Sequence, residues 1–155
     1  MSSVQEFQDV IKTVTDAIGS RIPDKALQTD LNARFPAHGP IYEKIFQSCK
    51  DGIGQGWMCK YEQGGVRYGR VIKPAEALGG YSVDVVRMQD LVGPHHRHPN
   101  GEIDLIMPLS PTAKFDQNPA GWLVYGPGSA HSPTVSDGAA LVLYLLPQGA
   151  IEFSR

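Results

Sequence analysis

The chain has 155 residues, of which 41% are hydrophobic and 19% are charged, and its formal net charge is -2. This length suits one domain with a single core, and the ordinary apolar content argues against intrinsic disorder. Basic and acidic residues number 14 and 16 and form no cationic run, so we expect neither a nucleic-acid nor a membrane partner. The 17 glycines and 12 prolines favour short strands joined by tight turns.

The first third of the chain predicts helices. Apolar side chains recur at three- and four-residue steps over residues 4–18, as on one face of an amphipathic helix. A second helix is expected over 23–35, opened by Pro-Asp and closed by a proline, and a third over 40–49. We expect these helices to cover the main core; a dimerisation element is the alternative. A homodimer or higher homo-oligomer is expected through some surface.

The pattern changes to short strands from Trp57 onward, with apolar stretches separated by glycine and proline turns. Strands are predicted over 57–62, 66–72, 81–88, 102–107, 122–125, 130–135, 139–146 and 151–153. Their even spacing, without helices between them, predicts a mainly β fold, an antiparallel sandwich or barrel. We therefore expect one domain over 1–155, with a helical segment at 1–52 and a β-barrel at 53–155.

Four residues in the second half of the chain predict a metal site. His96 and His98 are two positions apart, so on a strand both imidazoles point to the same face. A Pro-Asn-Gly turn then brings Glu102 back toward them, and His131 follows a glycine-rich turn at a strand start. Three imidazole nitrogens and one carboxylate oxygen suit a divalent transition metal such as iron, manganese or zinc. His95 points to the opposite face and is left out of the ligand set.

The sequence shows no sign of another cofactor or of export. A GxGxxG fingerprint after a strand is absent, so we expect neither a nucleotide nor a flavin. The first residues contain no basic segment followed by an apolar one, which predicts a cytoplasmic protein. Cys49 and Cys59 are then expected to be reduced thiols.

The spacing of these residues resembles two motifs of a known superfamily. His96-x-His98-x-x-x-Glu102, followed by Gly128-x-x-His131, is similar to the two metal motifs of the cupins. The resemblance implies a double-stranded β-helix, which is a small antiparallel barrel, with the metal in its mouth and these four side chains as ligands. Three turn positions depart from the superfamily pattern: Leu109, Gly126 and Val135.

Four longer segments resemble the bacterial 4-hydroxylaminobenzoate lyase family. They are Gly-Trp-Met-Cys at 56–59, Gly-Glu-Ile-Asp-Leu-Ile-Met-Pro at 101–108, and the stretches at 121–131 and 144–153. The resemblance implies a lyase that converts 4-hydroxylaminobenzoate to 3,4-dihydroxybenzoate (protocatechuate) with release of ammonia, in nitroaromatic degradation. The alternatives are another metal-dependent cupin enzyme, an oxygenase or isomerase acting on a small aromatic acid, and a non-catalytic ligand-binding cupin.

Such a reaction needs a proton shuttle and a partner for the substrate carboxylate. Glu102 is a catalytic candidate, and Asp104 joins it because it shares the strand parity of Glu102. An arginine fork suits a benzoate carboxylate, and the candidates on predicted strands are Arg67, Arg70 and Arg87. Trp122 and Tyr144 are candidates for an aromatic slot around the ring. The alternative for each arginine is an exposed strand charge, and for each aromatic residue a place in the core.

Overall fold

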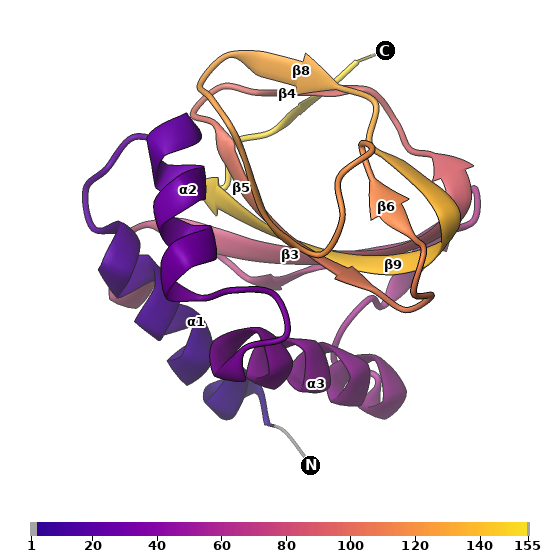
Figure 1. The fold of residues 1–155 in the computed structure, drawn as a ribbon, viewed down its shortest axis with the longest axis horizontal. Helices are drawn as coiled ribbons and strands as arrows, with labels where there is room; N and C mark the ends of the chain where they lie inside the picture. The colour runs from indigo at the N-terminus through magenta and orange to yellow at the C-terminus, as the bar shows by residue number, and fades with distance from the viewer. Residues whose placement is uncertain (1–2, 155) are drawn as a thin grey trace.

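The computed structural model describes residues 3–154, and within this range it contains three α-helices outside an antiparallel barrel (Figure 1). The helices are α1 (Val4–Ile18), α2 (Lys25–Arg34) and α3 (Pro40–Gln55). Ser3 and Asp24 cap α1 and α2 by accepting hydrogen bonds from backbone N–H groups of the first turn. Across the described residues, no helix is long and apolar enough to cross a membrane.

The third helix is longer than the sequence predicted. It continues past Gly52 and ends at Gly56, whose positive φ of 86° places it in the left-handed region. Gly52 stays inside the helix because it packs closely: a Cβ there would lie 3.0 Å from atoms of Trp57 and Met58. Gly52 therefore allows α3 to pack closely against the segment that follows it, and Gly56 is the residue that ends the helix.

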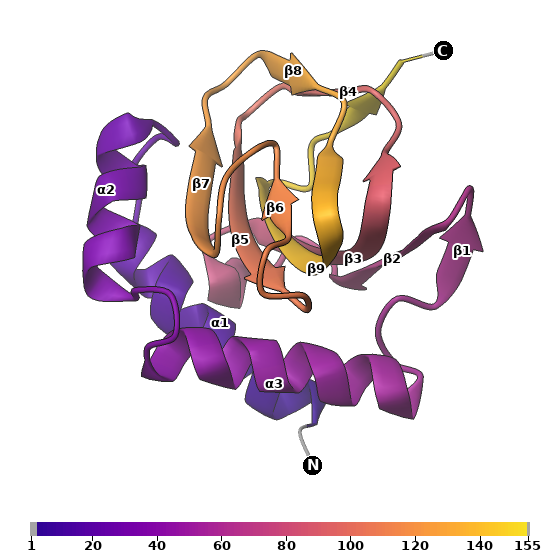
Figure 2. The same ribbon diagram turned by 45° about the vertical axis from the view of Figure 1, so that its right-hand side comes forward.

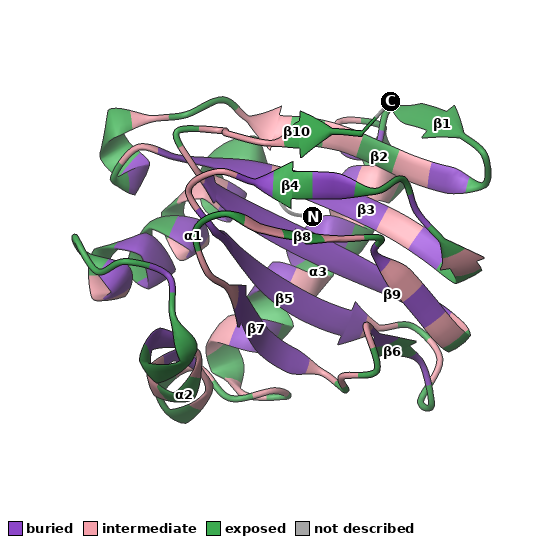
Figure 3. Cartoon of the chain, turned by 90° about the horizontal axis from the view of Figure 1, so that it is seen from above, coloured by how far each residue is buried: buried purple, intermediate pink, exposed green. Residues whose placement is uncertain are grey.

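The strands of the described chain form two sheets, and every pairing is antiparallel (Figures 2 and 3). The larger sheet has the order β1-β2-β3-β9-β5-β7, formed by Tyr61–Gln63, Val66–Ile72, Tyr81–Val92, Thr134–Pro147, Glu102–Pro108 and Gly121–Tyr125. The short β6 (Lys114–Phe115) pairs with β9. The smaller sheet has the order β10-β4-β8, formed by Glu152–Phe153, His96–His98 and Ser129–His131. A single 3₁₀ turn, η1 (Glu76–Leu78), precedes β3.

One predicted strand is split between the two sheets. The sequence predicted a continuous strand over 130–135, whereas the structure ends β8 at His131 and begins β9 at Thr134. Pro133 lies at the break, and its carbonyl accepts a hydrogen bond of 2.6 Å from the backbone N–H of Gly93. Because proline has no N–H for a ladder, the chain changes sheets at this point.

Both faces of the larger sheet are buried in its central strands β3, β9 and β5. Val83 and Val85 of β3 face outward and join the core that the three helices cover. Val86 and Met88 of the same strand face inward and pack with Phe115 inside the barrel. Figure 3 shows the long strands mostly buried, with exposed residues on the short strands of the smaller sheet. The mainly β prediction with a helical N-terminal segment is confirmed, and the inward face carries the site.

Candidate metal centre

The four predicted ligands meet at one end of the barrel. His96 and His98 come from β4, Glu102 begins β5, and His131 ends β8, where it pairs in register with His96. The Nε2 atoms of His98, His131 and His96 lie 3.1, 3.7 and 3.9 Å from carboxylate oxygens of Glu102. All four candidate ligand atoms lie within 4.8 Å of one another. His95 lies outside this group and contacts Ser154 with Nδ1.

Two of the imidazoles are oriented by oxygen acceptors outside the group. Nδ1 of His96 lies 3.1 Å from the carbonyl oxygen of Pro94. Nδ1 of His131 lies 2.6 Å from Oδ2 of Asp116. A carbonyl or carboxylate oxygen only accepts, so each Nδ1 carries the proton and donates. In the neutral ring, Nε2 then carries a lone pair, which in both residues faces the group.

The third imidazole is oriented in the same way, by a hydroxyl group that accepts from its Nδ1–H. Nδ1 of His98 lies 2.9 Å from Oγ of Ser129, and this hydroxyl donates its own hydrogen at 2.6 Å to the carbonyl of Gly126. Because the hydroxyl hydrogen of Ser129 is already donated to Gly126, Oγ of Ser129 accepts a hydrogen bond from Nδ1–H of His98. All three Nε2 atoms therefore present lone pairs to one point beside Glu102.

This donor set fits a cation. The side chain of Glu102 is 0% exposed, and within residues 3–154 neither its oxygens nor Nε2 of His98 receives a hydrogen bond from an N–H or hydroxyl group. Nε2 of His96 and Nε2 of His131 lie 3.1 Å apart, and both carry lone pairs. Buried acceptors that face one another without a proton between them are costly, and a metal ion removes that cost. Three nitrogens and one carboxylate suit a divalent transition metal.

Asp116 is a site residue that the sequence analysis missed. It precedes β7, and its carboxylate accepts hydrogen bonds from His131, from the hydroxyl of Tyr125 and, at 2.9 Å, from the backbone N–H of Thr134. Burial acts to raise the pKa of Asp116, but these hydrogen bonds together lower it below its ordinary value. The sequence offered only a carboxylate in a turn, fifteen residues before His131, which carries no specific signal.

Asp104 lies beside Glu102 on the inward face of β5, as its parity predicted. It is 0% exposed. Burial, and then the neighbouring Glu102, raise the pKa of Asp104 well above its ordinary value. Like those of Glu102, the carboxyl oxygens of Asp104 are buried and have no hydrogen-bond partner among the described residues.

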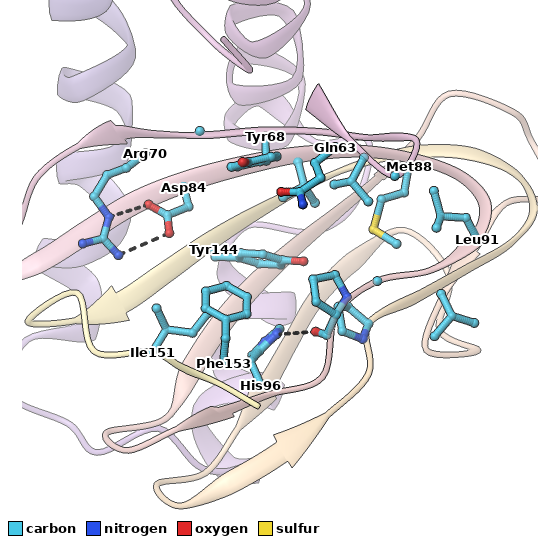
Figure 4. A pocket seen from close by; sticks show the side chains of 18 residues that line it. Gln63, Tyr68, Arg70, Asp84, Met88, Leu91, His96, Tyr144, Ile151 and Phe153 are labelled. Carbon is cyan, nitrogen blue, oxygen red and sulfur yellow. Dashed lines mark hydrogen bonds and ion pairs between the residues drawn. The ribbon is translucent and has the colours of Figure 1, made fainter. Parts of the chain in front are cut away.

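A cavity of about 660 Å³ opens on the inner face of the larger sheet and reaches the centre at His96 (Figure 4). A row of paired residues crosses the sheet along it: Arg70 pairs with Asp84, Asp84 with Tyr144, and Tyr144 with Asp104. Arg70, Asp84 and Tyr144 line the cavity, and Asp104 lies beyond them beside Glu102. Most of the other lining side chains are apolar: Val66, Val86, Met88, Leu91, Val92, Ile151 and Phe153.

The structure brings only some of the predicted substrate contacts to this cavity. Arg70 and Tyr144 line it, whereas Arg67 and Arg87 face one another across β2 and β3 and influence the Cys59 thiol. Arg87 does share the face of Val83 and Val85, but that face is the one covered by helices. Trp122 also lies on the helix side, where its indole N–H donates to the carbonyl of Phe35 at 3.1 Å.

The small antiparallel barrel, with three histidines and one glutamate converging at its end, has the predicted cupin-type fold. The family model described as "PnbB: 4-hydroxylaminobenzoate lyase" matches residues 9–153. The chain therefore belongs to the 4-hydroxylaminobenzoate lyase family.

Two curated relatives carry that same name. The protein from Nocardioides sp. (strain LMS-CY) is 31% identical, over 99% of this chain and 96% of its own length. The protein from Pseudomonas putida is 28% identical, over 86% of this chain and 88% of its own length. A solved structure titled "Crystal structures of DMSP lyases RdDddP and RnDddQII" aligns over 98% of this chain and 97% of that one. Its identity of 13% and TM-score of 0.50 show a likeness in fold alone.

Proposed function

We propose that the protein is a metal-dependent lyase that converts 4-hydroxylaminobenzoate to 3,4-dihydroxybenzoate and ammonia, with uptake of water, in the breakdown of nitroaromatic compounds. The observation that carries this proposal is the convergence of three imidazole lone pairs and one buried carboxylate beside an apolar cavity. The family and the names of the two curated relatives support the choice of substrate.

The metal belongs to the site where the lone pairs converge. His96, His98, Glu102 and His131 would hold it, and iron, manganese or zinc each suits this donor set. Bound there, the ion would supply Lewis acidity toward the hydroxylamine oxygen, whose bond to nitrogen breaks in the reaction.

The cavity residues bind and orient the aromatic acid. Among the described residues that line the cavity, Arg70 is the one Lys or Arg side chain, so it binds the benzoate carboxylate. Tyr144, Ile151 and Phe153 form apolar walls that receive the ring and exclude water from it. With its carboxylate at the rim, the substrate directs its hydroxylamino group toward His96.

Asp104 holds a proton in the proposed site, beside Glu102, which is a candidate metal ligand. The departure of ammonia requires protons, and the buried carboxyl group of Asp104 lies next to the candidate metal ligands. Two neighbouring buried carboxyl groups favour a shared proton over two negative charges. We therefore assign proton storage to Asp104, which Tyr144 and Asp84 separate from Arg70 in the paired row.

The test combines elemental analysis with an assay on 4-hydroxylaminobenzoate that follows ammonia and 3,4-dihydroxybenzoate. We expect equal ammonia release in air and without oxygen, loss of release in metal-stripped protein, and recovery on reloading. Absence of both products from the metal-loaded protein would overturn the proposed reaction. A strict need for oxygen would indicate an oxygenase instead, and full activity of protein shown to be metal-free would overturn the role of the metal.

A further inference from the structure

The hydroxyl group of Tyr144 is a nearly buried polar group without a partner in the fold. The side chain is 5% exposed and lines the cavity. Within residues 3–154 its hydroxyl has no hydrogen-bond partner. Figure 4 shows the ring in the middle of the cavity, with the hydroxyl at the end away from Arg70 and Asp84. Because buried polar groups in proteins are almost always paired, this hydroxyl has the features of a group that pairs with a bound molecule.

Carboxylates flank Tyr144 on both sides, and its hydroxyl donates to neither. In the register of the larger sheet, Tyr144 pairs with Asp84 of β3 and with Asp104 of β5. Tyr125 behaves differently, because its hydroxyl donates to the carboxylate of Asp116. The hydroxyl of Tyr144 therefore extends past its two neighbours into the cavity, and stabilising either aspartate does not explain it.

The ring of Tyr144 is held next to a candidate metal ligand. The ring centroids of Tyr144 and His96 lie 6.5 Å apart, and those of Tyr144 and Phe115 lie 6.3 Å apart. Phe115 is itself 0% exposed, so it forms a fixed support. Contacts with two other rings restrict the Tyr144 ring, and the direction of its hydroxyl is set before a ligand binds. A substrate group directed toward His96 therefore comes close to this hydroxyl.

We propose that the hydroxyl of Tyr144 donates a hydrogen bond to the hydroxylamino oxygen of the bound substrate. The inference deepens the proposed function and rests on it, because it requires the substrate to direct this group toward His96. A tyrosine hydroxyl keeps its proton at neutral pH, so it is a donor. When the N–O bond breaks, its electron pair goes to the oxygen, and the hydrogen bond stabilises the negative charge that develops there. Tyr144 keeps its own proton, touches the reacting atoms and is a catalytic residue.

The experiment measures by calorimetry how two unreactive analogues bind to the metal-loaded protein. In 4-(hydroxymethyl)benzoate a carbon replaces the nitrogen of the hydroxylamino group and the oxygen stays, whereas 4-ethylbenzoate has a methyl group in place of that oxygen. Tyr144→Phe should weaken binding of 4-(hydroxymethyl)benzoate by about tenfold, the worth of one hydrogen bond, and leave binding of 4-ethylbenzoate unchanged. In the same variant, kcat for 4-hydroxylaminobenzoate should fall by about 100-fold.

The matched control is Tyr81→Phe, because Tyr81 is a strand tyrosine that is also 5% exposed but packs in the helix-covered core. It should leave both affinities unchanged. An equal loss for the two analogues in Tyr144→Phe, or no loss for either, would overturn the inference, because a packing defect affects both alike and an unused hydroxyl affects neither. An unchanged kcat in this variant would overturn it as well. Failure of the proposed function is recognised separately, as a lack of ammonia release from 4-hydroxylaminobenzoate by the native protein.

Discussion

The carboxylate of Asp116 lies 2.6 Å from Nδ1 of His131 and fixes which nitrogen of that ring faces the candidate metal centre. Asp116 lies in a turn with a φ of +47°, and Thr134 at the start of β9 holds its other oxygen. The hydroxyl of Tyr125 donates to the same carboxylate from β7. Residues from separate parts of the barrel therefore set the orientation of one ligand.

We predict that Asp116→Asn weakens metal binding by about 10- to 100-fold, because a neutral amide no longer supports the basicity of the histidine. Competition with a chelator of known affinity measures the change. Asp137→Asn is the matched control, since Asp137 also has a positive φ, of 60°, and is an exposed residue of β9 outside the ligand group. Equal metal affinity in the native protein and Asp116→Asn would show that this carboxylate has no influence on the metal.

His131→Ala should remove the metal and with it the release of ammonia. The variant leaves His96 facing Glu102 with one imidazole fewer, and two nitrogens and one oxygen hold a transition metal less tightly. Metal content per chain after dialysis is the measurement. His95→Ala serves as control, because His95 is exposed and contacts Ser154 on the other side of the strand. A full metal content in His131→Ala would count against the ligand set.

The ligand group was predictable because it depends on local periodicity. His96 and His98 alternate on a strand, and Glu102 follows a short turn, so neighbouring positions determine their directions. His131 lies opposite His96 through a strand pairing that the sequence does not state, whereas its residue type and the cupin resemblance already assigned it to the ligand set. Helix boundaries followed the caps closely, except where packing kept Gly52 inside α3.

Other predictions failed because they required knowing which face of the sheet lines the cavity. Arg87 shares a face with buried valines, but a sheet with two buried faces does not reveal which face lines the cavity. Asp116 was not predictable because its role arises from a contact across the barrel. The pairing of Arg70 with Asp84 likewise requires the register of β2 with β3.

Helix α2 covers the β7 edge of the larger sheet, and we predict that removing this contact lowers the stability of the protein. Asn32 of α2 forms two hydrogen bonds with the backbone of Trp122 in β7, donating to its carbonyl at 2.9 Å and accepting from its N–H at 2.8 Å. We expect Asn32→Ala to lower the free energy of unfolding by about 2 kcal/mol, since it leaves two strand groups unpaired. Urea unfolding measures it. Gln5→Ala, which removes an exposed side-chain contact on α1, should cost far less.

The two cysteines predict a loss of stability at alkaline pH. Both are free and buried, and burial raises the pKa of Cys49 and raises that of Cys59 to about 11, with Arg67 and Arg87 acting in the opposite direction at Cys59. In the unfolded chain a thiol ionises near pH 8.5. Above that pH the unfolded state binds fewer protons than the folded state, so the free energy of unfolding falls as pH rises toward 11.

Cys59→Ala removes one of the two buried thiols, so the free energy of unfolding of the variant should fall less steeply as the pH rises. The difference between the variant and the native protein should change by about 2–3 kcal/mol between pH 8 and pH 11, from a shift of about two pKa units at Cys59. Urea unfolding at each pH gives both curves. Any effect of the substitution on packing adds a constant offset, which cancels when the slopes are compared. Parallel curves over this range would show that the Cys59 thiol ionises as readily in the fold as in the unfolded chain.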